Sequence, residues 1–291
     1  MDWIVALLLM ASPSPEGPGR SNEGPSKGVP DDGRKVVALV EELNGCLEID
    51  CAPIRVLVGR GPAIWPELAV GLVHRDEMVR FWTVGVLTEV PVPEARKDLI
   101  ALLGDKAVRI RAAAAFALGA QRSPEVVEAL VHALFDSDVN VRFEAASALG
   151  RVPDKRAVEP LIEVMADPDH DVRRAACEAL GNIGDARAKA TLVARLKDDR
   201  KPIVRGYAAV ALGTMKATDA VGEIAKRAGR ERDAEALSAM AWALGEVGSV
   251  ADGVSVTTLE ALEKHAHEGV RRHAGEALAV IRGREAGKKA P

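Results

Sequence analysis

Arginines and aspartates recur along this chain at intervals of about 31 residues, and both residue types could carry ionic chemistry. The arginines are Arg80, Arg111, Arg142, Arg173, Arg205 and Arg271. The aspartates occur at two offsets, with Asp105, Asp136, Asp167 and Asp199 at one and Asp76, Asp138, Asp169 and Asp233 at the other. A row of unpaired guanidinium groups would bind anions. An aspartate before a helix instead caps its free N–H groups and can accept a planar arginine fork, so the nearby acids favour a structural role.

Other residues that could support catalysis or bind a metal are scattered. The six histidines are His74, His132, His170, His265, His267 and His273. His265 and His267 stand two residues apart and do not share a helical face, so we interpret these histidines as surface residues. The sequence contains no glycine-rich phosphate loop and no Gly-x-Ser-x-Gly nucleophile motif. We therefore expect no cofactor, no metal site and no catalytic residues.

Three cysteines are too few for a disulfide framework. Cys46 and Cys51 bracket a short loop, and two interpretations stay open: a local disulfide in an exported protein, or two buried thiols. Cys177 lies in an alanine-rich stretch, which favours a role as a small apolar packing residue.

Two columns of leucines indicate which elements position these residues. The first column is Leu118, Leu149, Leu180, Leu212, Leu244 and Leu278, and the second is Leu68, Leu99, Leu130, Leu161, Leu192 and Ile224. A fixed period of this length means stacked units of secondary structure, so the sequence predicts an array of two-helix repeats. Aromatic residues supply only 3% of the chain, which also argues against a β fold.

Alanines accompany the first leucine column. They recur four residues before the leucine as Ala114, Ala145, Ala176, Ala208 and Ala274, and all six leucines directly follow an alanine. Small side chains on one stripe let helices approach to the short end of the usual separation of about 8–10 Å. We expect Gly150, which follows Leu149, to stand near the end of its helix, where glycine can adopt a left-handed turn.

The best repeats read DSDVNVRFEAASALGRVPDKRAVEPLIEVMAD over residues 136–167 and DPDHDVRRAACEALGNIGDARAKATLVARLKD over residues 167–198. This pattern resembles the HEAT-like repeat of the phycobilisome-lyase type. The resemblance implies an all-α fold, a right-handed α-solenoid (an armadillo/HEAT-like superhelix) of about seven two-helix repeats. It also implies that the Val-Arg helix lies on the convex side and that the partner helix lines the concave side. Aspartates and arginines of neighbouring repeats are then expected to form a ladder.

The repeat that contains Leu244 departs from this pattern. It has Ala236 and Leu237 in place of the Val-Arg pair, Met240 in place of an alanine, and Trp242 nearby. We expect the ladder to be interrupted here.

The chain divides by composition into five segments. We expect a hydrophobic N-terminus (1–11), a disordered Pro/Gly/Ser linker (12–34), capping helices (35–61), the solenoid (62–282) and a disordered tail (283–291). Residues 3–11 are apolar but too few to span a membrane, and they fit a signal peptide, a misassigned start or a terminal hydrophobic patch. The layout favours export, periplasmic or secreted, over a cytoplasmic location.

The formal net charge of −4 shows no basic excess, which makes a nucleic-acid partner unlikely. We expect a monomeric, non-catalytic scaffold that binds a protein partner on the concave face of the solenoid. Two alternatives stay open: an accessory subunit or lyase-like enzyme that acts on a protein-bound cofactor, and a nucleic-acid-associated solenoid. The candidate binding residues lie on the partner helices, and their charge runs from acidic to basic along the chain: Glu128, His132, Glu159, Glu163, Lys189, Arg195, Lys197, Lys226 and Arg227.

Overall fold

The structure is a computed structural model that describes residues 34–288. Our expectations for the hydrophobic N-terminus, for the linker up to residue 33 and for residues 289–291 fall outside this range. Within it, the chain consists of sixteen α-helices and short 3-10 turns, with no β-strand. The described residues form two compact units that divide between Ala117 and Leu118, inside helix α7.

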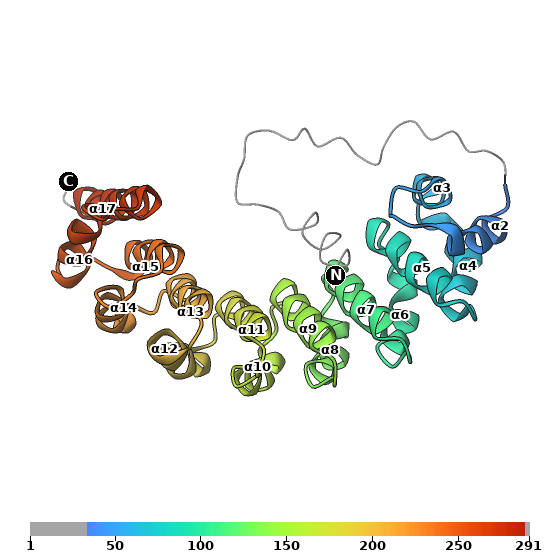
Figure 1. Cartoon of the computed structure of the whole chain (residues 1–291), viewed down its shortest axis with the longest axis horizontal. Coiled ribbons are helices and arrows are strands. Elements are labelled where there is room, and N and C mark those ends of the chain that lie inside the picture. Colours follow the sequence, from blue (N-terminus) through green and yellow to red (C-terminus); the bar gives the residue numbers. More distant parts are fainter. Residues whose placement is uncertain (1–33, 289–291) are drawn as a thin grey trace. The chain divides into compact units, whose positions relative to one another are not determined.

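The first unit opens with two short helices where the sequence predicts a cap. Helix α3 runs through Gly59 and ends at Gly61, whose φ of 70° lies in the left-handed region that favours glycine. The helices of this unit are α2 (Val36–Glu41), α3 (Ala52–Arg60), α4 (Trp65–Leu68), α5 (Glu77–Glu89), α6 (Arg96–Leu102) and α7 (Val108–Ala120), of which α7 crosses the boundary (Figure 1).

A disulfide between Cys46 and Cys51 closes the loop between α2 and α3. The loop is also fixed to helix α5, because the buried Trp82 donates a hydrogen bond of 2.9 Å from Nε1 to the Cys46 carbonyl. Ile49, at the tip of the loop, packs against Gly85, where a Cβ would lie 3.2 Å from its Cδ1. The sequence left two interpretations of the cysteine pair open, and the structure contains the disulfide.

The second unit continues the alternation of helices in regular order. Its helices are α8 (Val127–Ala133), α9 (Val139–Arg151), α10 (Val158–Val164), α11 (His170–Ile183), α12 (Lys189–Asp198), α13 (Pro202–Thr214), α14 (Val221–Ala228), α15 (Ala234–Val247), α16 (Val254–Leu262) and α17 (Glu268–Lys288). Counted from α4–α5 to α16–α17, the described chain holds seven helix pairs. This confirms the expected α-solenoid of about seven two-helix repeats.

The helices of the second unit form two rows (Figure 1). We call α9, α11, α13, α15 and α17, which carry the first leucine column, the inner row. We call α8, α10, α12, α14 and α16, the partner helices, the outer row. The leucines of both columns are buried between the rows, with Leu149, Leu180, Leu161 and Leu192 all at 0% exposure.

Glycines and alanines set the spacing within the inner row. A Cβ on Gly181 would lie 2.8 Å from the Cα of Ala211 in the next helix, and one on Gly245 would lie 2.8 Å from the Cβ of Ala277. Since carbon atoms in normal contact lie about 3.5–4.0 Å apart, these helix backbones nearly touch. Neighbouring outer-row helices contact each other much less than neighbouring inner-row helices do.

Because the inner-row helices approach each other most closely, the second unit curves with this row on its concave side (Figure 1). The expectation that the Val-Arg helices lie on the convex side was therefore wrong. The physical reason is that the stripe of small residues lies on the Val-Arg helices themselves, so the helices of this row approach each other more closely than those of the other row.

Two smaller expectations also need correction. Gly150 lies inside α9, not in a left-handed turn, and its lack of a side chain admits the Cα of Ala179, which would be 3.3 Å from a Cβ. Residues 283–288, expected in a disordered tail, continue helix α17 as far as Lys288. The stretch includes Gly283 and Gly287, but its other residues, Arg, Glu, Ala and Lys, favour helix, and it contains no proline.

Within residues 34–288, no single helix is long and apolar enough to cross a membrane. Helix α3 and the segment Pro62–Val73 pass that test only together, as a pair bent by 100°. Their apolar residues Ile54, Leu57 and Leu68 are buried in the first unit.

Candidate functional site

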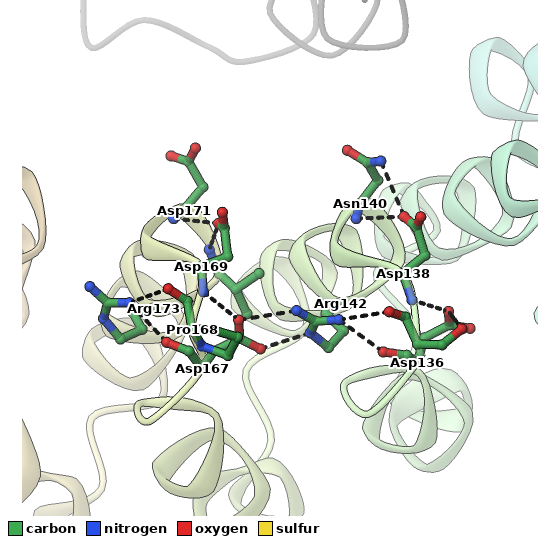
Figure 2. Close-up of polar contacts among 11 residues, drawn as sticks. Asp136, Asp138, Asn140, Arg142, Asp167, Pro168, Asp169, Asp171 and Arg173 are labelled. Carbon is green, nitrogen blue, oxygen red and sulfur yellow. Dashed lines mark hydrogen bonds and ion pairs between the residues drawn. The ribbon is translucent and has the colours of Figure 1, made fainter.

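An ion-pair ladder joins consecutive repeats of the second unit at the N-terminal ends of the inner-row helices (Figure 2). Arg142 donates from Nε and Nη2 to the two carboxylate oxygens of Asp167, at 2.7 and 3.2 Å. Arg173 makes the same fork with Asp199, at 2.8 and 2.9 Å. In each arginine, Nη1 donates to two backbone carbonyls of the preceding loop. These guanidinium groups are fully engaged within the protein, so they do not form an anion site.

The second set of aspartates caps the helices. Asp169 accepts hydrogen bonds from the N–H groups of Asp171 and Val172, at 2.8 and 3.2 Å, and Asp138 accepts one from Asn140 (Figure 2). Such caps satisfy N–H groups that have no partner within the helix. The expected capping aspartates are confirmed at Asp76, Asp138, Asp169 and Asp233.

Two of the ladder carboxylates, Asp199 and Glu231, have buried side chains and lowered pKa values. Burial by itself raises the pKa of Asp199, but hydrogen bonds from Arg173 and a backbone N–H outweigh it and hold that pKa below its ordinary value. The same balance applies at Glu231, where the Arg205 fork and backbone N–H groups lower the pKa to about 2 against the effect of burial. The ladder is therefore part of the folded core at neutral pH.

The first unit contains a pair of the same kind, since Arg80 donates to Asp105 at 2.8 and 3.1 Å. In the second unit, Glu231 takes the acid position opposite Arg205, at 2.7 and 2.8 Å. The ladder then stops, because Leu237 occupies the arginine position of α15 and is buried.

A second, exposed ladder lies at the other end of the repeats, and our sequence reasoning missed it. Arg156 pairs with Asp154 at 2.8 Å and donates to the carbonyl of Pro124 in the preceding repeat, also at 2.8 Å. Arg187 repeats this with Asp185 and with the carbonyl of Lys155. The signal was present as an Asp-x-Arg triplet that recurs after 31 residues.

The nine candidate binding residues all lie on outer-row helices, from α8 to α14, and thus on the side opposite the concave face. Placing them on the concave face was wrong for the reason given above: the inner row closes up through its glycines and alanines, and the outer row stays spread.

Most of these nine residues pair with neighbouring side chains. Across repeats, Glu128 lies 3.7 Å from Arg156, Glu159 accepts from Arg187 at 3.1 Å, Lys189 donates to Asp219 at 2.6 Å, and Lys197 lies 3.7 Å from Glu223. Arg195 and Arg227 reach the buried ladder acids Asp199 and Glu231, at 3.7 and 2.9 Å. The charges of these six residues are therefore paired within the solenoid. His132, Glu163 and Lys226 are exposed.

The concave surface carries an arginine between two aromatic rings. The Cζ atom of Arg174 on α11 lies 5.4 Å from the ring centre of Phe143 on α9 and 5.2 Å from that of Tyr207 on α13. Both distances suit cation–π attraction, so these side chains link three successive inner-row helices.

Next to this stack, four apolar side chains form what we call the inner patch: Ile203, Tyr207 and Val210 on α13 and Trp242 on α15. Ile203 and Trp242 are 39% and 38% exposed, and Tyr207 and Val210 are half-buried. The sequence signal was Trp242 in the irregular repeat, which we noted without assigning it to the concave face.

One group of possible metal ligands comes together in the described residues, formed by Asp169, His170 and Asp171 with ligand atoms within 4.8 Å of one another. The Asp169 carboxylate already accepts two backbone N–H groups as the cap of α11. We assign no metal to it.

Comparison with known structures agrees with the fold. The chain is similar to the complex of CpcE and CpcF of phycocyanin lyase from Nostoc sp. PCC7120 at 23% identity, with 77% of this chain and 96% of that chain covered and a TM-score of 0.51. It is similar to the Escherichia coli protein YibA at 20% identity, with coverage of 88% and 98% and a TM-score of 0.59. An engineered protein matches at 25% identity, with coverage of 65% and 98% and a TM-score of 0.50. No curated protein matches the chain in sequence.

The family model for HEAT repeats matches three overlapping stretches, residues 66–138, 129–213 and 190–279. Together they cover most of the chain, including both ladders and the inner patch. The chain belongs to the HEAT repeat family.

Proposed function

We propose that this protein is a non-catalytic HEAT-repeat scaffold that binds a protein partner on the concave, inner-row surface of its second unit. The observation that carries this proposal is where the non-repeating residues gather. The repeating leucines, alanines, glycines, aspartates and arginines are used in the stack and its two ladders. The exposed apolar side chains of the inner row, Ile203 and Trp242, and the half-buried Val210 beside them take no part in the two ladders or in the leucine columns.

The outer row supports this proposal by contrast. Its charged residues mostly pair with each other between repeats, and exposed ion pairs of this kind contribute little to binding. Interface centres are instead enriched in Trp, Tyr and Arg, the residue types that gather on the concave surface.

A capture experiment that compares the two rows tests the proposal. We would immobilise the wild-type chain, a Ser147→Arg variant of the inner row and a Glu163→Arg variant of the outer row, and quantify the bound proteins from the source cell by mass spectrometry. Both substitutions place an arginine on the surface of a helix; the net charge rises by one unit with Ser147→Arg and by two units with Glu163→Arg, so the outer-row control carries the larger change in charge. We expect the specific partner to be lost with Ser147→Arg and kept with Glu163→Arg; the reverse pattern would refute the proposal.

The lyase-like alternative rests on the fold shared with the phycocyanin lyase complex, at an identity that supports the fold alone. It predicts that the purified chain carries or transfers a chromophore. Visible absorption spectra of the preparation distinguish the two, because a scaffold without a cofactor is colourless.

A further inference from the structure

We propose that the inner patch binds a protein segment that presents an apolar anchor flanked by lysines or arginines. This inference rests on the proposed scaffold function and specifies the chemistry of the partner. Three observations support it: the shape of the patch, its departure from the repeat pattern, and the charge around it.

The four side chains of the patch form one surface across two helices. Ile203, Tyr207 and Val210 are spaced i, i+4 and i+7 on α13, which places them on one helical face. Trp242 of α15 leans against the same helix, because its Cζ3 lies 2.8 Å from the position of a Cβ on Gly213. Because Gly213 has no side chain, the indole can pack directly against α13, and the other face of the ring remains exposed.

The apolar character of the patch is local to α13 and α15. At the position of Trp242, two residues before the leucine of the first column, other inner-row helices carry polar residues: Ser147, Glu178 and Glu276. At the position of Ile203, they carry Asn140, Asp171 and Glu235. Since the same positions are polar elsewhere, the stack does not require apolar residues there. A group of exposed apolar side chains with a polar border is typical of a binding site.

The border of the patch is acidic. On the surrounding inner-row helices, the acids Asp171 and Glu178 of α11, Glu235 of α15 and Glu276 of α17 outnumber the cations Arg174 of α11 and Arg272 of α17. Arg174 is itself engaged, because it donates to Asp171 at 3.3 Å and stacks against two rings. Glu246 of α15 is matched by two cations of its own, Lys216 after α13 and Arg284 of α17. The excess negative charge favours a partner with basic residues.

The aromatic rings favour the same partner. Tyr207 already holds one cation against its face, and the open face of Trp242 offers a second such position. A lysine or arginine beside an apolar anchor would contact an indole face and an acidic border at once.

The charge argues against two other occupants. The apolar N-terminal run, residues 3–11, contains no lysine or arginine. A second copy that bound through the same patch would bring two acidic borders together, which costs binding free energy. A basic, apolar segment of another protein fits better than either.

Fluorescence anisotropy with defined peptides tests the inference on the full chain. The probe is a fluorescein-labelled peptide KKALSALLKK, and its charge-reversed partner EEALSALLEE is the matched control. We expect the basic peptide to bind at least tenfold more tightly, which corresponds to about 1.4 kcal/mol. We expect Trp242→Ala and Val210→Ser to weaken it at least tenfold and Glu235→Lys to weaken it about threefold.

Phe135 supplies the control substitution, because it is 50% exposed at the end of outer-row helix α8. Phe135→Ala should leave the affinity unchanged. Trp242→Phe should restore most of the binding lost in Trp242→Ala, and circular dichroism of each variant establishes that it is folded. Equal affinity for the two peptides, or an affinity that Trp242→Ala and Val210→Ser do not alter, would overturn the inference.

Two further outcomes would assign the patch to another occupant and also overturn it. One is peptide binding that appears only after residues 2–33 are removed, and the other is self-association that depends on Trp242. A failure of the inference about the inner patch can be distinguished from a failure of the scaffold proposal. If the row-specific capture of a partner persists in Trp242→Ala, the scaffold proposal stands and only the inference about the patch is wrong.

Discussion

Substitution of Gly181 by alanine tests how closely the inner-row helices α11 and α13 pack. In an exposed helix interior, Gly→Ala stabilises by about 1 kcal/mol through helix propensity. At Gly181, however, the added Cβ would lie 2.8 Å from the Cα and 3.0 Å from the Cβ of Ala211. Contact distances are about 3.5–4.0 Å, so helices α11 and α13 would have to separate by roughly 0.7–1 Å. Overpacking of this kind costs about 1–3 kcal/mol, and we expect a net loss of stability of that size.

Two further glycines calibrate the measurement. At Gly150 the nearest atom would be 3.3 Å away, so alanine there should change stability by less than about 1 kcal/mol. At Gly283, exposed in α17 with nothing within 4 Å, alanine should stabilise by up to about 1 kcal/mol. Urea unfolding followed by circular dichroism gives all three values, with m-values compared because repeat arrays can unfold in steps. Stabilisation by Gly181→Ala, at the level of Gly283→Ala, would refute the close approach of the inner helices.

Three other predictions concern buried charge and the disulfide. Asp199→Ala leaves Arg173 unpaired in the core and should destabilise by about 3–5 kcal/mol, measured by urea unfolding; a loss below about 1 kcal/mol would mean that the ladder is not buried in solution. Burial raises the pKa of Glu144 to about 8 despite the nearby Arg151. Since that pKa is above its unfolded value, the folded state holds the extra proton, and the stability from this group is complete below about pH 4.5 and is lost as the pH rises to about 8. Glu144→Gln should flatten the stability profile over that window, and an unchanged slope between the two proteins would contradict the assignment. Cys51→Ser opens the loop between α2 and α3 and should lower the stability of the first unit by about 2 kcal/mol, seen as faster hydrogen exchange in α5; wild-type exchange rates would count against a stabilising role of the disulfide.

The periodic residues were sufficient to predict the fold. Leu149 and Leu161 mark the two helices of one repeat, and the structure buries both. The capping role of Asp169 also follows from sequence alone, because a cap depends only on the residues next to it.

The direction of curvature could not be predicted in the same way. It depends on which row of helices packs more closely, and that depends on contacts between glycines and alanines about 30 residues apart, such as Gly181 and Ala211. We interpreted Gly150 as a helix end, although its role is to admit a neighbouring backbone. With the curvature reversed, the candidate residues from Glu128 to Arg227 were placed on the wrong face.

The inner patch was only partly visible in the sequence. Trp242 stood out because it interrupts the repeat pattern, but Ile203, Tyr207 and Val210 occupy ordinary helical positions. Their common surface becomes evident only once α13 and α15 are packed side by side through Gly213. The departure from the repeat pattern therefore pointed to the repeat that contains Trp242, but the packing of α13 against α15 was needed to find the other residues of the inner patch.

Site-directed photocrosslinking from the two rows would identify the surface that binds the partner. Benzoylphenylalanine would be placed at the half-buried Val210 on the inner row and, in a second protein, at the exposed Glu163 on the outer row. Irradiation in the source cell and mass spectrometry would then identify the crosslinked partner. We predict a partner crosslink from Val210 and none above background from Glu163. A specific crosslink from Glu163 with none from Val210 would mean that the partner binds the outer row.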